Sequence, residues 1–554
     1  MDLKNFFKKY WFYIFIAVLS IFVSWPTFLS GYFSHHDDLQ VMRIFEMRKC
    51  FSDLQIPCRW VPDMGYGNGY PLFNYYNVFP YYIGALASYI LGFVGSAKFL
   101  FFAAAYFAGF SMFLLAKEFM SLYPALLASI LYIFAPYRAL DIYVRGAVSE
   151  SFAIVVIPLV IYFALKILKE NSLKFILGLA LSFAAFLTSH TIMTLIFAPL
   201  ILVLFIIIFW GKKVVYIKSL IFSLGLGVGL SAFFIIPAFF EKDLVQIENL
   251  VRLDLDFRAH FVTIRQLLFE RSWGYGASFP GPLDSISFQV GWPHWILAAL
   301  SIITLLFKKN RRIFFIYFAL LVFFAFSLFM THNKSAFIWE SIGMLRFVQF
   351  PWRFLSLSIF TSSLLAGFLF NTFKPSFVRV TFFALVLATV LLNWGYFKPE
   401  KFYPYLTDRE KLSGELWEIQ QKASIMDYLP KGAIEPNEKT GDKPLVVTGD
   451  AEIYYFKKTS NNFEAKISVK SPALIEFPVY DFPNWKVTEE GKEIDQRSDN
   501  YLGRVSIMLE GGNHKILGKF YDTPIRRAGN IISFVSILLV CYLIFYGKIR
   551  KNFK

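Results

Sequence analysis

The sequence is poor in cysteine, histidine and charge. It holds three cysteines and seven histidines among 554 residues, and only 17% of its residues are charged. No Cys/His spacing resembles a zinc site, and neither a GxxxxGK(S/T) phosphate loop nor a Gly-x-Ser-x-Gly elbow is present. The sequence therefore contains no motif that indicates zinc, P-loop nucleotide or serine-hydrolase chemistry.

What the chain has in excess is apolar and aromatic surface. Hydrophobic residues make up 56% of it, aromatic residues 20%, and the mean hydropathy is +0.52. A soluble chain of this length is far less apolar, so the composition predicts a polytopic membrane protein. The net charge of +16 does not predict a nucleic-acid partner, because many Lys and Arg residues fall in short links between apolar runs, as in cytoplasmic loops.

Apolar runs long enough to cross a bilayer predict about twelve membrane-spanning helices. They lie near residues 10–29, 98–116, 121–136, 150–168, 173–189, 191–210, 219–240, 292–307, 313–330, 354–371, 377–396 and 529–547. The basic segment Met1 to Tyr10 precedes the first run, which has no small-residue cleavage site. We therefore expect a retained signal anchor.

A further apolar stretch, Phe79 to Gly95, decides the topology. If it crossed the membrane, the basic clusters between later runs would lie outside. If it lies in the membrane interface, these clusters become cytoplasmic, as the positive-inside rule favours. They are Lys166 to Lys174, Lys212 and Lys213, Lys308 to Arg312, and the tail Lys548 to Lys554. We predict the interfacial arrangement, with both termini cytoplasmic in a multi-pass protein of the plasma (inner) membrane.

This topology divides the chain into three parts. Residues 1–396 form the transmembrane domain, with external loops at 30–97, 137–149, 241–291 and 331–353. Residues 397–528 form an extracytoplasmic β-rich domain, because runs such as Ala465 to Lys470 and Ala473 to Tyr480 alternate with period two and are separated by turns such as Glu490-Gly491. Residues 529–554 form the last helix and a basic cytoplasmic tail.

Two charged clusters fall on the predicted outer face. The first is His35-His36-Asp37-Asp38 with Arg43, and the second is Arg138, Asp141, Arg145 and Glu150. Charge at a membrane boundary is costly and is usually functional, so the clusters together indicate a site. Cys50 and Cys58 share the first external loop and could form a disulfide in an oxidising compartment, whereas Cys541 lies in the last helix.

Several runs resemble one bacterial family of polytopic membrane proteins. They are Ile56 to Tyr76 (IPCRWVPDMGYGNGYPLFNYY), Pro80-Tyr-Tyr82, Pro136-Tyr-Arg138, Tyr143 to Glu150 (YVRGAVSE), Phe350-Pro-Trp-Arg353 and Phe482 to Val487 (FPNWKV). The family is labelled "6-pyruvoyl-tetrahydropterin synthase-related" and is similar to YfhO-type proteins. Nothing in the sequence supports pterin chemistry. The resemblance instead implies the GT-C architecture of glycosyltransferases that use polyprenyl-phosphate-linked sugars.

Two local patterns are similar to those of GT-C oligosaccharyltransferases. In these enzymes an Asp of the first external loop precedes an Arg by six residues, as Asp37 precedes Arg43. An Arg of their second external loop precedes an acidic residue that opens a helix, as Arg145 precedes Glu150. A paired acidic motif around Glu150 is absent. The expectation is therefore no cofactor, with a divalent metal as the alternative. Juxtamembrane helices in GT-C first loops agree with an interfacial 79–95 segment.

Inverting transfer from a polyprenyl phosphate needs a base for the acceptor proton and cations for the departing phosphate. The candidate catalytic residues are Asp37, Asp38 and Glu150, with Asp37 favoured as the base. Guanidinium groups stay charged and bind phosphate bidentately. The candidate substrate-binding residues are Arg43, Arg59, Arg138, Arg145, His190 and Arg353. The expected partners are the lipid-linked sugar donor, membrane lipids, and a glycan, lipid or protein acceptor.

Each assignment has a structural alternative. Asp37 and Asp38 could cap the first juxtamembrane helix, and Glu150 could complement a helix dipole. Arg138 and Arg145 could be interfacial anchors, and His190 a hydrogen-bonding residue between two spans. The whole protein could be a non-catalytic transporter or scaffold for lipid-linked polymers in cell-envelope assembly. The acidic residues, however, cluster at external helix ends rather than at mid-span, which favours surface chemistry.

Overall fold

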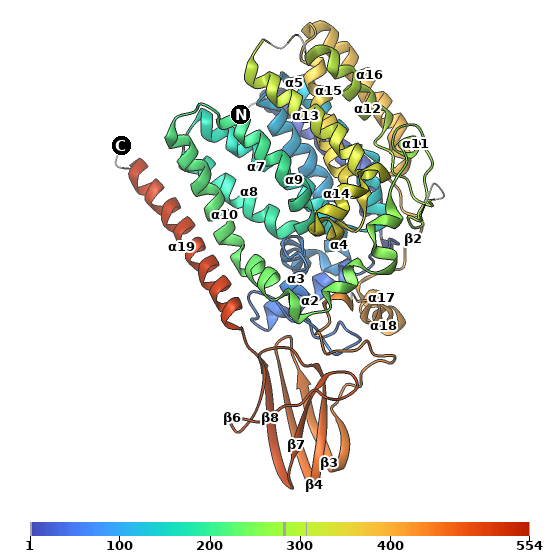
Figure 1. Ribbon diagram of the computed structural model, residues 1–554, viewed down its shortest axis with the longest axis vertical. Coiled ribbons are helices and arrows are strands. Elements are labelled where there is room, and N and C mark those ends of the chain that lie inside the picture. The colour runs from blue at the N-terminus through green and yellow to red at the C-terminus, as the bar shows by residue number, and fades with distance from the viewer. Residues whose placement is uncertain (1–2, 281–283, 306, 308, 425, 553–554) are drawn as a thin grey trace.

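The protein is a bundle of apolar helices with an antiparallel β-sheet at one end (Figure 1). The computed structural model describes residues 3–280, 284–305, 307, 309–424 and 426–552. The apolar helices are α1 (Leu3–Val23), α4 (Phe79–Lys117), α5 (Leu122–Ile133), α7 (Val148–Lys169), α8 (Leu173–Ser189), α9 (Thr191–Phe209), α10 (Val214–Phe240), α12 (Trp292–Leu305), α13 (Arg311–Thr331), α15 (Leu355–Phe370), α16 (Pro375–Asn393) and α19 (Pro524–Asn552).

Within the described residues, eight helices are long and apolar enough to cross a membrane, or nine if α5 and the segment Pro136–Arg145 count as one bent span. Three further apolar helices, of 10 to 17 residues, are Tyr10–Val23 within α1, α8 and α12. Each of the twelve expected runs therefore lies in a helix. The chain is a multi-pass membrane protein, while the number of spans stays a prediction.

Helix α15 forms the centre of the bundle. Every one of its residues is buried, and it contacts α5, α12 and α13. Small hydroxyl side chains allow neighbouring helices to approach closely and can bond to their own helix, as Thr361 does to the carbonyl of Leu357. By contrast, only 22% of the α16 span and 17% of the α19 span are buried, so these helices lie at the edge.

Helix α4 is broken at Gly92, whose φ of 68° lies in the left-handed region. The break is capped from another part of the chain. The carboxylate of Asp408, in α17 (Asp408–Lys411), accepts hydrogen bonds from the backbone N–H groups of Phe93 and Val94 at 2.8 and 2.7 Å. The part of α4 before the break corresponds to the 79–95 stretch, whose place in the membrane interface remains a prediction.

Short elements fill the segments between the spans. The helix η1 (Trp25–Phe28) precedes the first loop (30–97), which was predicted to be external and holds β1 (Tyr32–Phe33), α2 (Gln40–Ser52) and α3 (Leu72–Tyr75). The second holds α6 (Pro136–Ala139) and the π-helical turn η2 (Leu140–Arg145). Later segments hold η3 (Lys242–Leu244), η4 (Ile247–Val251), η5 (Leu253–Leu255), η6 (Phe257–His260), α11 (Ile264–Leu268), η7 (Asn333–Ser335), α14 (Ala336–Ser341), η8 (Gly343–Val348), η9 (Pro351–Phe354) and η10 (Trp394–Tyr396).

The β-sheet is antiparallel, with strand order β3-β4-β8-β5-β6, and β7 also pairs with β4. Its strands are β3 (Leu445–Lys458), β4 (Asn462–Tyr480), β5 (Trp485–Glu489), β6 (Lys492–Glu493), β7 (Arg504–Leu509) and β8 (Gly512–Phe520). Both sequence runs expected as strands lie in β4, where Phe463, Ala465 and Ile467 alternate into the core. The β-rich prediction is confirmed for this region.

Residues 397–444 join the bundle and the sheet. Here β2 (Phe402–Tyr403) pairs with β1 of the first loop, and the helices α17 and α18 (Gly414–Lys422) and the turn η11 (Met426–Tyr428) follow. The strands thus occupy 445–520 of the expected β-rich range. The last helix begins at Pro524, before the expected residue 529, and its side chains beyond residue 545, including the basic tail, lie outside the described side chains.

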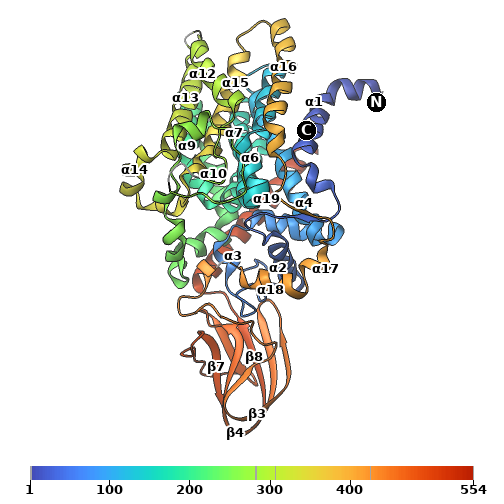
Figure 2. The ribbon, with the colours of Figure 1, turned by 90° about the vertical axis from the view of Figure 1, so that its right-hand side faces the viewer.

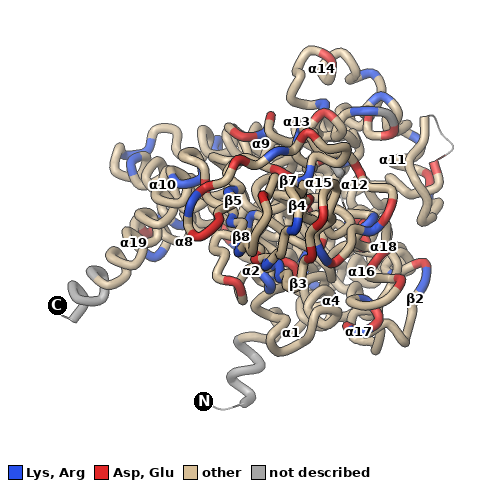
Figure 3. Tube along the Cα trace, turned by 90° about the horizontal axis from the view of Figure 1, so that it is seen from below, with Lys and Arg blue, Asp and Glu red and all other residues tan. Residues whose placement is uncertain are grey.

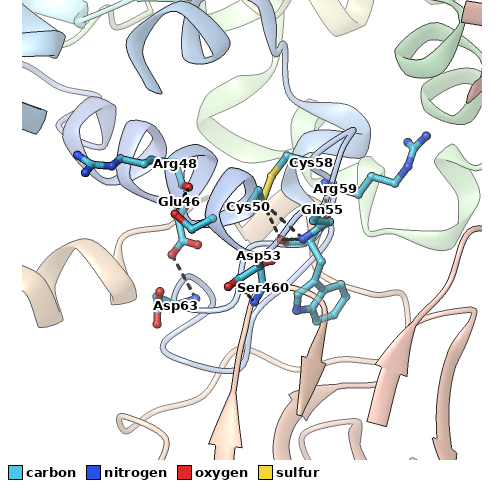
Figure 4. The surroundings of a disulfide bond; sticks show 11 residues. Glu46, Arg48, Cys50, Asp53, Gln55, Cys58, Arg59, Asp63 and Ser460 are labelled. Carbon is cyan, nitrogen blue, oxygen red and sulfur yellow. Dashed lines mark hydrogen bonds between the residues drawn. A yellow bond between two sulfur atoms is a disulfide. The ribbon is translucent and has the colours of Figure 1, made fainter. Parts of the chain in front are cut away.

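The sheet is docked onto the first external loop. Trp60 is buried against Phe482, Trp485 and Phe520 of the β domain. The ammonium of Lys458 donates to the carbonyls of Pro62, Gly67 and Pro478. A disulfide joins Cys50 to Cys58, a pairing that the sequence left open, and the backbone N–H of Ser460 donates to Asp53 beside it (Figure 4). The first loop and the sheet therefore form one packed unit.

Candidate functional site

A cavity of about 1060 Å³ lies where the loops that were predicted to be external meet the bundle. Its walls come from segments far apart in the chain: the first loop, the start of α7, the link between α8 and α9, the end of α10, the loops at 247–260 and 277–286, the segment 344–353, and the turn η11. Of the nine candidate residues, five line this cavity: Asp37, Arg145, Glu150, His190 and Arg353. The expected convergence of the two charged clusters is thus observed.

Backbone pairing brings the two clusters together. The N–H groups of His36 and Asp37 donate to the carbonyls of Val144 and Arg145 at 2.8 and 3.1 Å. The turn that follows Arg145 needs Gly146, which has a φ of +69° and packs so closely that a Cβ there would lie 2.4 Å from His35 Nδ1. These contacts place Asp37 beside the second charged cluster.

The carboxylate of Asp37 is held by the buried guanidinium of Arg43. The bidentate pair has distances of 2.7 and 2.9 Å, and Gln40 donates a third hydrogen bond of 3.1 Å. Arg43 also lies 4.3 Å over the Tyr76 ring. Helix α2 has Leu39 at its N-cap and no side-chain cap bond, so neither Asp37 nor Asp38 caps it. The capping alternative is wrong.

Arg145 and Glu150 form the centre of the second cluster. Nη1 of Arg145 donates to Asp141 at 2.5 Å and to Glu150 at 2.8 Å, and the guanidinium lies 4.8 Å over the Trp352 ring. The other oxygen of Glu150 accepts a 2.5 Å hydrogen bond from Tyr137. Glu150 also lies in the first turn of α7, where its negative charge complements the helix dipole. This role is compatible with its ion pair to Arg145.

Arg353 approaches the same carboxylate from η9. Its Nη1 donates to the carbonyl of Val348 at 2.7 Å and to Gln349 at 3.1 Å. Its Nε lies 3.6 Å from Glu150 and, among the described residues, is buried without a hydrogen-bond partner. This donor is enclosed by protein atoms, so it acts on the Glu150 carboxylate rather than on the cavity space.

His190 combines a local and a cavity role. It is the N-cap of α9, where its Nδ1 accepts from the backbone N–H of Met193 at 3.2 Å. Burial lowers the pKa of His190 to about 3, so the ring is neutral at physiological pH. His190 can therefore orient a ligand by hydrogen bonding, but it does not add a positive charge for a phosphate.

Four candidates do not line the cavity, which corrects their expected substrate contact. Asp38 binds Lys411 at 2.6 Å, outside the cavity lining. Arg43 lies behind Asp37 and orients it. Arg138 is buried and donates to the carbonyl of Ala104 at 2.8 Å. The sequence flagged these charges because they lie near a membrane boundary, but it does not show which charges reach the cavity and which face other parts of the protein.

Arg59 is the fourth, and it ties three elements together. It is buried, and it donates to Asn74 at 2.7 Å, to the carbonyl of Phe233 in α10 at 3.2 Å, and to Asn530 in α19 at 2.7 Å. Its Nε lies 3.0 Å from Asp522. Figure 4 shows its side chain extending away from the strands. Arg59 therefore connects the docked loop to the helices that form the cavity.

The cavity also has residues that the sequence did not indicate. Lys242, Asp254, His260, Asp427 and Tyr428 line it. Asp427 and Tyr428 lie in the polar stretch before the sheet, where charges are common and no motif marks them. Acidic and basic residues are indeed mixed across the sheet end of the molecule (Figure 3). Only the folded arrangement distinguishes the residues that reach the cavity.

One wall of the cavity is apolar. It is formed by Phe234, Ile235, Ala238 and Phe239 of α10, with Met344 and Phe347 nearby along the lining. Phe239 and Met344 are largely exposed, at 62% and 60%. As for metals, the described residues contain no group of three or more His, Cys, Asp or Glu side chains arranged to hold an ion. The cavity thus joins a polar cluster to an apolar surface.

No protein-family model matches the chain, and no curated protein matches it. The resemblance to the pterin-labelled family and to YfhO-type proteins therefore stays a prediction. Among solved structures, the chain is similar to arabinofuranosyltransferase AftD from Mycobacteria, with 12% identity and a TM-score of 0.46, covering 72% of this chain and 28% of AftD.

Two further structures show the same level of similarity. The oligosaccharyltransferase AglB from Archaeoglobus fulgidus, in complex with an inhibitory peptide and a dolichol-phosphate, is 12% identical, with a TM-score of 0.42 and coverage of 71% of this chain and 56% of AglB. ArnT from Cupriavidus metallidurans, bound to undecaprenyl phosphate, is 12% identical, with a TM-score of 0.36 and coverage of 70% and 71%. The chain spans less than two thirds of AftD and AglB. At this level the similarities do not assign a function.

Proposed function

We propose that the protein is a GT-C-type glycosyltransferase that transfers a sugar from a polyprenyl-phosphate-linked donor to an extracytoplasmic glycan, lipid or protein. One observation carries the proposal. Asp37, Arg145, Glu150 and Arg353, from three separate segments, line one cavity whose other wall is apolar. A lipid-linked sugar phosphate needs these two surfaces side by side, because its chain is apolar and its phosphate is charged.

Arg353 and Arg145 hold the phosphate in this proposal. Asp141 and Glu150 already balance the two positive charges, so the phosphate is held by directed hydrogen bonds rather than by net charge. The hydrogen bonds of Arg353 to described residues use Nη1 alone, which leaves Nη2 to supply such a donor. Guanidinium groups remain charged and fit phosphate oxygens in a fork, which suits them to stabilise charge that develops on the departing phosphate.

Asp37 takes the acceptor proton. The acceptor oxygen bonds to the anomeric carbon as the bond from that carbon to the phosphate oxygen breaks, the electron pair leaves with the phosphate, and the configuration inverts. The proton passes to Asp37, whose orientation is fixed by Arg43 and Gln40. Positioning of a carboxylate within reach of the acceptor is the requirement for general-base catalysis. Phe234, Ile235 and Phe239 contact the first units of the lipid.

The test uses the full chain in lipid nanodiscs with radiolabelled sugars linked to undecaprenyl phosphate. We expect release of undecaprenyl phosphate with at least one donor, together with saturable binding of undecaprenyl phosphate alone. Binding without turnover of any donor would favour the alternative of a transporter or scaffold for lipid-linked polymers. Absence of both binding and turnover would contradict the proposal entirely.

A further inference from the structure

The turn η11 contributes a second polar surface to the cavity, apart from the arginine cluster. Asp427 and Tyr428 both line the cavity, and the Tyr428 ring lies parallel to that of Tyr75, with centroids 5.9 Å apart and an interplanar angle of 8°. Tyr76 meets the same ring edge-on at 6.4 Å. Three tyrosines from two distant segments therefore form one aromatic wall.

This aromatic wall is fixed in place. The Tyr75 hydroxyl donates to the carbonyl of Glu241, at the end of α10, at 2.8 Å. Burial is the main cause that raises the pKa of the Tyr428 hydroxyl, and the charges of Arg43 and Arg353 oppose the rise. Tyr76, which meets the Tyr428 ring, donates a 3.5 Å hydrogen bond to Asp37 and lies under the Arg43 guanidinium, so the wall adjoins the Asp37–Arg43 pair.

Asp427 differs from Asp37 and Glu150, the two carboxylates of the charged clusters in the cavity. The oxygens of Asp37 accept from Arg43, and those of Glu150 accept from Tyr137 and Arg145. The carboxylate of Asp427 makes no hydrogen bond or ion pair with any described residue, although it is more than half buried. Burial raises its pKa to about 6, and the charge of Asp254 adds to the shift. An ionised carboxylate accepts hydrogen bonds and donates none. Its natural partners are therefore hydroxyl or N–H groups of a ligand.

We propose that Asp427 and Tyr428 form the acceptor subsite and that the acceptor bound there is a carbohydrate whose hydroxyl groups donate to Asp427. The assignment as acceptor subsite rests on the proposed transfer reaction. Sugars present both hydroxyl donors and apolar C–H faces, and an aromatic wall with one open carboxylate provides a surface for each. Because Tyr76 joins the aromatic wall to Asp37, a sugar bound against this wall lies beside the base.

The test measures binding, so it does not require a known acceptor. The full chain in nanodiscs is titrated with methyl glycosides of common hexoses and pentoses, followed by saturation-transfer NMR, and separately with undecaprenyl phosphate. We expect Asp427→Asn and Tyr428→Leu each to weaken glycoside binding about tenfold. Asp427→Asn loses the hydrogen bond to a charged group, and Tyr428→Leu loses the ring contact. Tyr428→Phe keeps the ring and should bind almost as the wild type does. Undecaprenyl phosphate binding should be unchanged in all three.

Asp442→Asn is the matched control, because Asp442 is exposed on the same segment and does not line the cavity. Hexylamine is titrated as a non-carbohydrate ligand whose N–H groups could bond to Asp427. The carbohydrate assignment would be overturned if the wild type binds no methyl glycoside, or if it binds hexylamine in preference to the methyl glycosides. Glycoside binding that Asp427→Asn leaves intact would overturn the subsite. Failure of undecaprenyl phosphate binding alone would contradict the proposed function but not this surface, so the two failures are distinguishable.

Discussion

At the scale of single residues, the question is whether Asp37 is a base or a structural partner of Arg43. Asp37→Asn keeps the size of the side chain and one acceptor oxygen for Arg43, but it removes the basicity. If Asp37 takes the acceptor proton, sugar transfer should fall about 100-fold or more, the usual yield of general-base catalysis. The measurement is the initial rate of labelled sugar transfer from a polyprenyl-phosphate donor, with expression matched between variants.

Asp38→Asn is the adjacent control for this experiment. Asp38 pairs with Lys411 outside the cavity lining, so its substitution should leave transfer within a few-fold of the wild type. Near-normal transfer in Asp37→Asn would reject Asp37 as the base. Glu150 and Asp427, whose carboxylates also line the cavity, would then be tested in the same assay.

Arg353 provides the second prediction at this scale. Arg353→Lys keeps a positive charge but cannot keep both the bonds to Val348 and Gln349 and a free planar donor. We expect the KM for the lipid-linked donor to rise about tenfold or more, with the acceptor KM unchanged. Arg346→Lys is the control, because Arg346 is exposed in the preceding helix η8 and does not line the cavity. Equal effects of both substitutions would argue against a specific phosphate contact.

The sequence predicted part of this site because charge next to a long apolar run is rare and visible. Asp37, Arg145 and Glu150 were identified in that way, Arg353 came from a motif of the family resemblance, and all four line one cavity. The charge signal also selected Arg138, and the resemblance also selected Arg59, and the partners of both inside the protein cannot be read from sequence. It missed Asp427, which lies in a polar segment where a carboxylate carries no information until the fold brings it to the cavity.

At the scale of elements, the contact between the sheet and the first loop governs the cavity wall. Trp60 inserts among the aromatic side chains of the β domain, and the adjacent Arg59 bonds to Asn74, next to Tyr75 of the aromatic wall. Trp60→Ala should cost about 3–5 kcal/mol of folding free energy in this unit, as large-to-small substitutions of buried aromatic residues do. The loosened loop should then be cleaved more than tenfold faster in limited proteolysis.

Tyr501→Ala is the matched substitution in the same domain, since Tyr501 is 72% exposed. It should leave the cleavage rate near that of the wild type. Equal protection of Trp60→Ala and the wild type would show that the sheet docks by other contacts, such as those of Lys458. If Trp60→Ala lost sugar transfer but stayed as protected from proteolysis as the wild type, the first loop would have a direct role in transfer that does not depend on support by the sheet.

Element types were predictable here, but their long-range partners were not. Continuous apolar runs and period-two alternation gave the helices and the strands, because each pattern follows from burial of one kind of surface. The cap that Asp408 provides to α4 joins residues more than three hundred positions apart and follows no local pattern. The strands β1 and β2 are also more than three hundred positions apart in the sequence. The sequence therefore placed residues 397–444 in the β domain, although they pack on the first loop.

At the scale of the whole molecule, the start of α1 and the end of α19 lie at the end of the bundle opposite the sheet (Figures 1 and 2). Helix α7 begins at the cavity with Glu150 and ends at Lys169, which pairs with Glu118 at 2.7 Å. The cavity and the sheet therefore share one side of the bundle, and the basic link between α7 and α8 belongs to the other side. This arrangement is what the interfacial prediction for 79–95 requires.

The last prediction tests that topology with single cysteines in a Cys541→Ser background, which removes the exposed free thiol while Cys50 and Cys58 stay paired. Asn171→Cys lies among Lys166, Lys169 and Lys174, whose charge should keep it cytoplasmic. Asp450→Cys, exposed on β3, reports the sheet side. A membrane-impermeant maleimide should label Asp450→Cys in intact cells and Asn171→Cys only after permeabilisation. Labelling of Asn171→Cys from outside would instead place the link between α7 and α8 outside, and the cavity at the other end of α7 would then face the cytoplasm, where an acceptor outside the cell could not reach Asp37.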